Sequence, residues 1–298
     1  DIEVAADRKS VVFKLHPDAR FSNGDPVLAK DVKHSFDMVT SKLASPRQRV
    51  LLEDIESCVV LGERTVRFTF KNSEKHMPLV AGSVMVFSHK WGQVKGQVKP
   101  FDQIITEHPI ASGPYRIGKV VNNRDITYQR DPNYWGKDLN VRKGLFNFDR
   151  ITYRMYTDNV SAFEGFKAGE FDFIQSYIAK DWVRQYKGRK FDSGELVKQT
   201  LPHGNPANFQ GFIFNTRLDK FKDPRVRQAI GMAMDYEWMN RQLFYNAYQR
   251  VNGLFGNTEC AATGEPSADE LTLLEPWRQQ LPEAVFGPMT TPPRTDGD

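Results

Sequence analysis

The sequence predicts a mixed α/β (α+β) fold, and three observations support this prediction. Segments in which apolar and polar residues alternate, as they do in strands, are interspersed with segments that have the 3.6-residue spacing of helices. Clusters of Gly, Pro, Asn and Asp separate these segments. Apolar residues make up 40% of the 298 residues and aromatic residues 12%, which is enough for a substantial core in one large or two ordinary domains.

The first part of the chain is predicted to contain a strand, a helix and a hairpin. We expect a strand at residues 11–15, after which the turn-forming letters NGDP at residues 23–26 lead into a helix. Residues 55–60 and 65–71 flank the short link LGER in the manner of a hairpin. The apolar residues of the helix share one face, which we expect to be core: Ala29, Val32, Phe36 and Val39.

The middle of the chain is predicted to be mostly strand. Residues 92–99 repeat the letters GQVK, and we interpret them as an exposed loop that carries lysines. Residues 115–121 and 125–130 have the pattern of a second hairpin. A further strand is expected at residues 148–156 and a helix at residues 160–168, which Gly169 would end.

The last part of the chain is predicted to alternate between helix and strand. The expected segments are a helix near residues 179–186, strands at 195–201 and 209–215, a helix at 268–280 and a connector at 287–298. A long helix should begin after Asp223 and Pro224, which have the character of an N-cap and a first-turn proline. We expect its apolar face to be core, formed by Val226, Ile230, Met234 and Trp238.

Charge and hydropathy argue against several classes of protein. The 41 basic and 37 acidic residues give a net charge of only +4, spread along the chain, so a dedicated nucleic-acid binder is disfavoured. The best apolar run, residues 77–87, is too short to cross a bilayer. Because the chain starts at Asp1, we expect that an export signal was removed or not included. Cys58 and Cys260 are expected to be isolated thiols, with a long-range disulfide as the alternative.

No catalytic or metal-binding constellation stands out in the sequence. The six histidines have no metal-ligand spacing, and neither a glycine-rich phosphate loop nor a serine between glycines occurs. The acidic pairs Glu53-Asp54 and Glu170 with Asp172 fit solvated surface charge better than acid–base catalysis. We therefore expect no enzyme activity, no cofactor and no metal site.

Three stretches, in order, resemble the family 5 extracellular solute-binding proteins, the oligopeptide-, dipeptide- and nickel-type receptors of bacterial ABC importers. They are FKLHPDARFSNGDPVLAKDVKHSFD, ASGPYRIGKVVNNRDITYQRDPNYWG and FNTRLDKFKDPRVRQAIGMAMD. Three further stretches are similar to the YejA-like branch, which is associated with oligopeptides and microcin-type conjugates: HGNPANFQGFIFNT, EWMNRQLFYNAYQRVNGLF and PSADELTLLEPWRQQLP. The resemblance covers the chain from about residue 10 to its end.

The resemblance implies a periplasmic-binding-protein type II fold, in which two hinged lobes with an accessory subdomain close on a ligand. Family members are longer, so we expect the chain to be incomplete. Residues 1–108 would form the accessory subdomain of the first lobe, residues 109–156 the first lobe with a crossing strand, and residues 157–298 the second lobe. The helix after NGDP would then be scaffold.

The implied function is the capture of oligopeptides or peptide-like solutes for import. The expected partners are the peptide and a membrane permease, with no nucleic acid, and the protein would be a monomer that is periplasmic or lipid-anchored outside the cytoplasm. The alternative function is a hydrolase that uses Asp or Glu together with His203. A nucleic-acid binder is the third hypothesis, and steeply salt-sensitive binding would mark it.

The candidate ligand contacts follow from position within the resembling motifs: Asp158, Asn159, His203, Asn205, Asn208 and Asn215. Each has a plainer alternative. Asp158 and Asn159 are also well placed to cap the helix that starts near Val160. His203, Asn205 and Asn208 lie in the proline- and glycine-bearing loop that contains PHGNP, for which an ordinary turn is an equally good explanation, and Asn215 lies at the end of the expected second-lobe strand.

Overall fold

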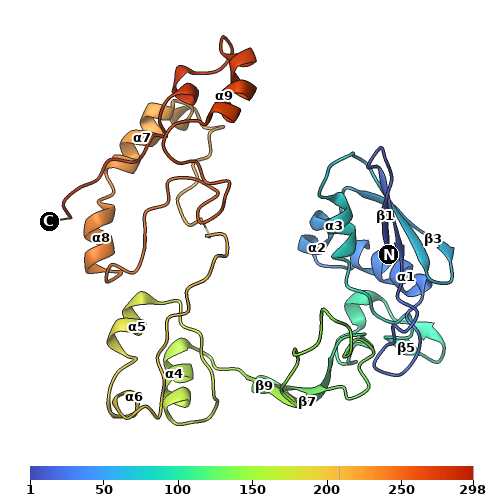
Figure 1. The fold of residues 1–298 in the computed structure, drawn as a ribbon. Helices are drawn as coiled ribbons and strands as arrows, with labels where there is room; N and C mark the ends of the chain where they lie inside the picture. The colour runs from blue at the N-terminus through green and yellow to red at the C-terminus, as the bar shows by residue number, and fades with distance from the viewer. Residues whose placement is uncertain (208, 298) are drawn as a thin grey trace. The chain divides into compact units, whose positions relative to one another are not determined.

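The computed structural model describes residues 1–207 and 209–297 and divides the chain into two compact units (Figure 1). The first unit is Asp1–Ala162 and the second is Phe163–Asp298. The fold contains both sheets and helices, as the sequence predicts. Within the described residues, none of the helices is both long enough and apolar enough to span a bilayer.

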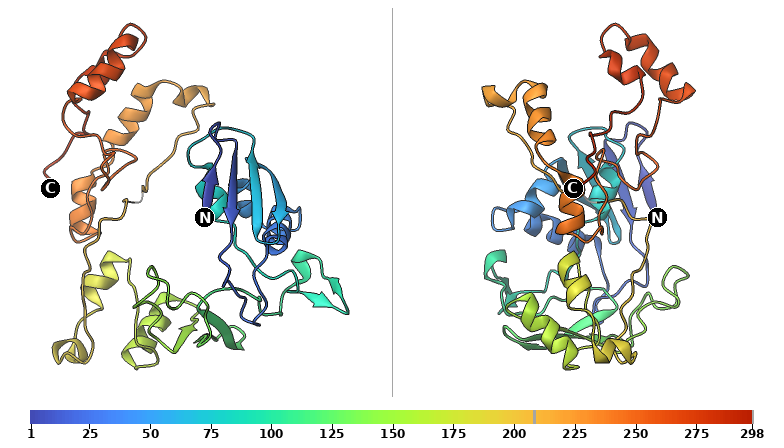
Figure 2. Two further views of the ribbon diagram at one scale, coloured as in Figure 1. Left: turned by 45° about the vertical axis from the view of Figure 1, so that its right-hand side comes forward. Right: turned by 90° about the vertical axis from the view of Figure 1, so that its left-hand side faces the viewer.

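The first unit is built around a four-stranded antiparallel sheet with the strand order β1-β2-β4-β3. Helices α1, α2 and α3 lie beside this sheet (Figures 1 and 2). The bounds of the strands are Ile2–Val4 for β1, Ser10–Lys14 for β2, Ile55–Gly62 for β3 and Thr65–Phe70 for β4. Those of the helices are Ala29–Thr40 for α1, Pro46–Leu51 for α2 and Met77–Gly82 for α3.

The predicted core face of α1 is confirmed. Ala29, Val32, Phe36 and Val39 are all buried, and they belong to one hydrophobic cluster with residues of β3, β4 and α3. Alternate residues of β4, which are Val66, Phe68 and Phe70, point into the same cluster and are at most 2% exposed. The hairpin β3–β4 is also confirmed, since Val60 lies opposite Val66 and Cys58 opposite Phe68.

A buried carboxylate joins the start of α1 to the segment around His89. Asp31 is 1% exposed, and one of its oxygens accepts a hydrogen bond from the Leu28 backbone N–H at 2.9 Å. The other oxygen lies 3.0 Å from the His89 backbone nitrogen and 2.6 Å from His89 Nδ1. Because these bonds satisfy buried polar groups on two segments, Asp31 holds them together.

Residues 92–99 form a small hairpin, so the prediction of a plain loop is wrong in this detail. Strands β5 (Gln93–Val94) and β6 (Gln97–Val98) pair across Lys95 and Gly96, which both have positive φ angles, 51° and 82°. A two-residue turn with both central residues at positive φ matches the twist of its flanking strands, and glycine at the second position favours it. The hairpin is exposed, as expected.

The remaining sheet of the first unit has the order β7-β8-β9. Strands β7 (Tyr115–Val121) and β8 (Asp125–Arg130) have the bounds that the sequence predicts, and they pair as an antiparallel hairpin. Strand β9 (Arg150–Arg154) is shorter than the predicted strand at 148–156. Its pairing with β8 runs only from Arg150, opposite Gln129, to Arg154, opposite Asp125.

The second unit is helical in its regular parts. A small core cluster of Phe163, Phe166 and Tyr186 lies between α4 and α5. The helices are α4 (Asn159–Lys167, which begins in the first unit), α5 (Ala179–Arg184), α6 (Arg189–Asp192), α7 (Pro224–Met232), α8 (Tyr236–Gln242) and α9 (Ala268–Leu274). Short 3-10 turns occur at Asp219–Phe221, Glu275–Trp277 and Glu283–Phe286, and a further one at Phe101–Gln103 belongs to the first unit.

The strands expected at residues 195–201 and 209–215 are absent from the described residues. A strand is stable only when its backbone pairs with a neighbour, and no described segment pairs with either stretch. The apolar residues that suggested a strand are exposed instead, with Phe212 at 87% and Ile213 at 89%.

The long helix expected after Asp223 is two helices. α7 ends at Met232, and the Asp235 carboxylate starts α8 by accepting a hydrogen bond from the Trp238 backbone N–H at 2.9 Å. A capping side chain in the middle of the apolar pattern therefore interrupts the helix. The expected core face is also wrong for this unit, since its four residues are 37–45% exposed: Val226, Ile230, Met234 and Trp238.

The last predicted helix is shorter than expected, and proline explains why. α9 covers Ala268–Leu274, and a 3-10 turn at Glu275–Trp277 follows it. Pro276 has no backbone N–H with which to continue the α-helical hydrogen bonds. Ser267 and Glu270 form a capping box at the other end of α9.

Cys58 and Cys260 are both free thiols, as expected. Burial against the core raises the pKa of the Cys58 thiol to about 12, so it stays protonated at neutral pH. Cys260 is exposed.

Candidate functional site

Asp158 caps helix α4. One of its carboxylate oxygens accepts a hydrogen bond from the Ser161 backbone N–H at 2.8 Å. The other accepts from the Ser161 hydroxyl at 2.9 Å and from the Thr157 hydroxyl at 3.2 Å. These hydrogen bonds, first of all the one from the Ser161 backbone, lower the pKa of Asp158 below its ordinary value. Asn159 is the first residue of the helix and is exposed.

The capping alternative for Asp158 therefore has a geometric basis. An ionised carboxylate at a helix N-terminus is also favoured by the helix dipole. Both oxygens of Asp158 already accept hydrogen bonds, yet each has a further lone pair, and the residue is exposed. A role in ligand binding remains a prediction.

His203 and Asn205 lie together in an exposed turn of the second unit. The Asn205 backbone N–H donates to His203 Nδ1 at 3.2 Å. Asn257 packs against this turn, because its side-chain amide donates to the Asn205 carbonyl at 2.7 Å. A backbone hydrogen bond of 2.8 Å from Ala207 to Gly256 continues the contact. Asn208, the next predicted site residue, lies outside the described residues.

Asn215 belongs to a different turn of the same unit. Its side-chain oxygen accepts a hydrogen bond from the Arg217 backbone N–H at 3.1 Å, and its carbonyl accepts from Leu218 at 3.1 Å. This Asx turn leads the chain toward the cap of α7, where Asp223 accepts from the Arg225 backbone N–H at 2.9 Å. The structure thus joins His203 to Asn205 and places Asn215 in its own turn.

Three residues of the second unit make contacts that the sequence reasoning did not foresee. Asn257 stabilises the turn of His203 and Asn205 through its side-chain hydrogen bond, and its own backbone is left-handed, with φ of 60°. Tyr248 donates its hydroxyl to the Tyr177 carbonyl at 3.2 Å, and the Tyr177 ring is 76% exposed. The signal that points to Tyr177 is an aromatic residue in a stretch without helical or strand periodicity.

The segment 209–214, which has no regular secondary structure, offers free backbone as well as apolar side chains. Its backbone groups make no hydrogen bond with another described residue. Phe212 and Ile213 are almost fully exposed, and Phe209 is 49% exposed. An extended stretch with free N–H and C=O groups is able to pair with another extended chain.

The described residues contain no group of three or more His, Cys, Asp and Glu that could hold a metal ion. His203 forms no ion pair with a carboxylate in the described part of the chain. The geometry around His203 is therefore that of a turn, built from backbone and amide contacts.

The chain belongs to family 5 of the bacterial extracellular solute-binding proteins, whose family model (the middle region) matches residues 1–283. It is 37% identical over 294 residues to YejA of Escherichia coli K12, described as uncharacterized, and covers 48% of that protein. It is 34% identical over 286 residues to a probable peptide-binding protein, YejA of Agrobacterium fabrum, and covers 46% of it. These alignments include 99% and 94% of the present chain.

A solved structure supports the same fold. The binding protein AgaA from A. tumefaciens R10, solved with agropinic acid, superposes with a TM-score of 0.64 at 24% sequence identity. The match covers 91% of this chain and 50% of AgaA. The predicted fold class, the two-lobed type II periplasmic-binding-protein fold, is thus confirmed, and the chain spans about half the length of the curated relatives it matches. Its family consists of binding proteins, not enzymes.

Proposed function

We propose that this protein is the peptide-binding receptor of a bacterial ABC importer. The observation that carries the proposal is the family match over residues 1–283. The Agrobacterium fabrum relative, which aligns with 94% of the chain and is described as a probable peptide-binding protein, narrows the solute to peptides.

The free backbone of residues 209–214 supports a peptide as the solute. Peptides of different sequence share only their main chain and charged ends, so a receptor with broad specificity has to bind the main chain. Backbone without a described partner offers such bonds, and the exposed rings of Phe212 and Tyr177 offer apolar surface for peptide side chains.

The six candidate residues keep their assignment as ligand contacts within this proposal: Asp158, Asn159, His203, Asn205, Asn208 and Asn215. Residues 1–108, 109–156 and 157–298 correspond to accessory subdomain, first lobe and second lobe. The receptor acts as a monomer in the periplasm, or is lipid-anchored outside the cytoplasm, and delivers its peptide to a membrane permease.

Native mass spectrometry tests the proposal. The chain is incubated with a mixture of short peptides at micromolar concentration, and the retained peptides are identified from the mass of the complex. We expect retention of peptides with varied side chains and unchanged covalent structure. Absence of any retained peptide would contradict the proposal.

The hydrolase alternative makes the opposite prediction in the same experiment. Cleaved peptides would then accumulate, and the substitution His203→Ala would abolish cleavage. A panel of esters, peptides and glycosides without any turnover excludes this alternative for the chain.

A further inference from the structure

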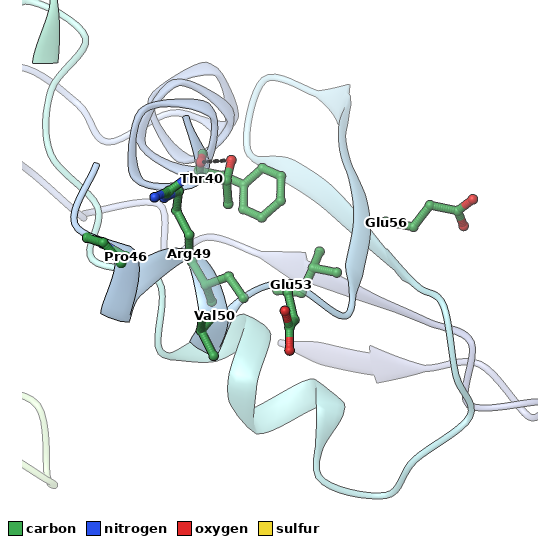
Figure 3. Close-up of a pocket in the computed structure, with 9 residues that line it drawn as sticks. Thr40, Pro46, Arg49, Val50, Glu53 and Glu56 are labelled. Carbon is green, nitrogen blue, oxygen red and sulfur yellow. Dashed lines mark hydrogen bonds between the residues drawn. The ribbon is translucent and has the colours of Figure 1, made fainter. Parts of the chain in front are cut away.

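A surface pocket of the first unit lies apart from every residue assigned to peptide binding. Its volume is about 520 Å³, and it is formed by the end of α1, helix α2 and the start of β3 (Figure 3). Its floor is apolar, because Phe36, Leu52 and Ile55 are each at most 7% exposed. Three charged residues also line it: Arg49, Glu53 and Glu56.

Arg49 is a half-buried cation without a counter-charge. Its Nε atom is buried and has no hydrogen-bond partner among the described residues, and its guanidinium forms no ion pair with any of them. The nearby Thr40 hydroxyl donates to the Phe36 carbonyl at 2.7 Å and makes no hydrogen bond with Arg49 Nε (Figure 3). A partly desolvated charge without a partner is unfavourable, and a bound anion would relieve this cost.

Glu53 lies about one helical turn beyond Arg49, but the two side chains do not pair. The Glu53 backbone N–H still donates to the Val50 carbonyl at 3.4 Å, so the chain coils up to this point. Residues four apart on a helix are commonly close enough for an ion pair. Figure 3 shows instead the carboxylates of Glu53 and Glu56 at other edges of the pocket than the guanidinium of Arg49.

The charges select the class of ligand. A simple anion would be attracted by Arg49 but repelled by the two glutamates, and a simple cation would leave Arg49 uncompensated. A zwitterion satisfies both signs, and an apolar group between its charges would cover the floor of Phe36, Leu52 and Ile55.

We propose that this pocket binds a free apolar α-amino acid, with its carboxylate on Arg49, its ammonium group toward Glu53, and its side chain on the apolar floor. We propose a single amino acid because it carries both charges on one carbon and fits within the volume of about 520 Å³, whereas the charged ends of a peptide lie farther apart. The site is independent of the proposed peptide receptor function, because it contains none of the residues assigned to that function.

The test is a titration of the chain with L-leucine, followed by ¹⁵N–¹H NMR and calorimetry. We expect saturable shifts of amides in α2 and at the start of β3. 4-Methylpentanoate, which lacks the amine, and 3-methylbutylamine, which lacks the carboxylate, should each bind about tenfold more weakly or worse. The dipeptide Leu-Leu distinguishes a free amino acid from a peptide end, and it should also bind more weakly at these amides.

Two variants on α2 provide a matched comparison. Arg49→Gln should weaken leucine binding about tenfold or more and leave peptide retention unchanged. Arg47→Gln removes the same charge from an exposed position on the same helix that does not line the pocket, and it should bind leucine like the wild type. A thermal unfolding curve for each variant checks that it is folded.

Three results would overturn the proposal. The first is that leucine does not bind saturably at concentrations up to about 10 mM, because a dissociation constant above this value is too weak for a specific site. The second is equal binding of leucine and either single-charge analogue. The third is equal weakening by Arg47→Gln and Arg49→Gln. Peptide retention by the Arg49→Gln variant is measured separately, so a failure of leucine binding does not count against the peptide receptor proposal.

Discussion

At the scale of single residues, the structure separates side chains that build the fold from those that are free to bind a solute. Asp31 is of the first kind, since both of its oxygens are engaged inside the first unit. The exposed Tyr177 ring is of the second kind. Asp158 combines a cap for α4 with an exposed position, so its two roles are compatible.

Replacement of Asp31 by alanine should strongly destabilise the first unit. The change leaves the partly buried Leu28 and His89 backbone N–H groups without their acceptor, which costs about 2–4 kcal/mol of unfolding free energy. Urea unfolding measures this loss. Asp37→Ala is the control on the same helix, because Asp37 pairs with Lys33 at the surface and should contribute less than about 1 kcal/mol. Equal losses for both variants would contradict the role assigned to Asp31.

At the scale of elements, caps and turns decide where the helices begin and end. Asp158, Asp235 and Ser267 start α4, α8 and α9 by accepting hydrogen bonds from backbone N–H groups of the first turn. A sequence pattern of apolar residues extends across Asp235 without a break, yet the cap divides it. Short-range hydrogen bonds thus outweigh apolar periodicity at this position.

The cap of α4 should make stability depend on pH. Because the pKa of Asp158 is lower in the folded chain, its ionised form stabilises α4 above the ordinary value of 3.8, and this contribution is lost as the pH falls through the lower folded pKa. Asparagine also caps helices but does not titrate. Between about pH 5 and pH 2, Asp158→Asn should therefore lose less stability than the wild type, as urea unfolding followed by circular dichroism would measure.

The control for this experiment is Asp172→Asn, which removes one exposed carboxylate that caps no helix. A pH profile of the Asp158→Asn variant that coincides with the profile of the wild type would show that the cap does not titrate as expected.

At the scale of the whole molecule, the two units differ in how much apolar surface they bury. The first has a continuous core between its four-stranded sheet and α1. The second has the small cluster of Phe163, Phe166 and Tyr186, while the apolar faces of α7 and α8 are partly exposed. Units with few buried contacts open more readily than units with many.

Hydrogen exchange should therefore be slowest in the first unit. We expect the backbone amides of β2 and β4, the strands that contain the buried Val11, Val66 and Phe68, to exchange at least about a hundredfold more slowly than those of α7 and α8. Mass spectrometry after pepsin digestion resolves these segments. Equal protection of α7 and β4 would show that the second unit is as stable as the first.

Local patterns were sufficient to predict much of the first unit. The hairpin of β7 and β8 has the predicted bounds, and the core face of α1 contains the four predicted residues. Both depend on interactions between residues close in sequence or on a single periodic face. The motifs that resemble solute-binding proteins are also short contiguous stretches of sequence, and the family match confirms the family that they indicated.

The candidate site was predictable only in part. The turn of His203 and Asn205 was expected, but its support by Asn257 was not, because the two segments lie far apart in sequence. The pocket of Arg49 could not be predicted either, since three elements have to fold before Phe36, Leu52 and Ile55 share one floor.

The sequence by itself determined the class of this protein, helix α1 and the hairpins β3–β4 and β7–β8 of its first unit, and its lack of a recognisable catalytic motif. These properties depend on residue types and short spacings, which the chain carries before it folds. Tertiary structure decided that residues 209–214 have no described hydrogen-bond partner, that α7 and α8 are separate, and that Arg49 is half-buried without a counter-charge. Pairing, burial and charge compensation depend on distant segments, because each requires a neighbour that only the folded chain brings near.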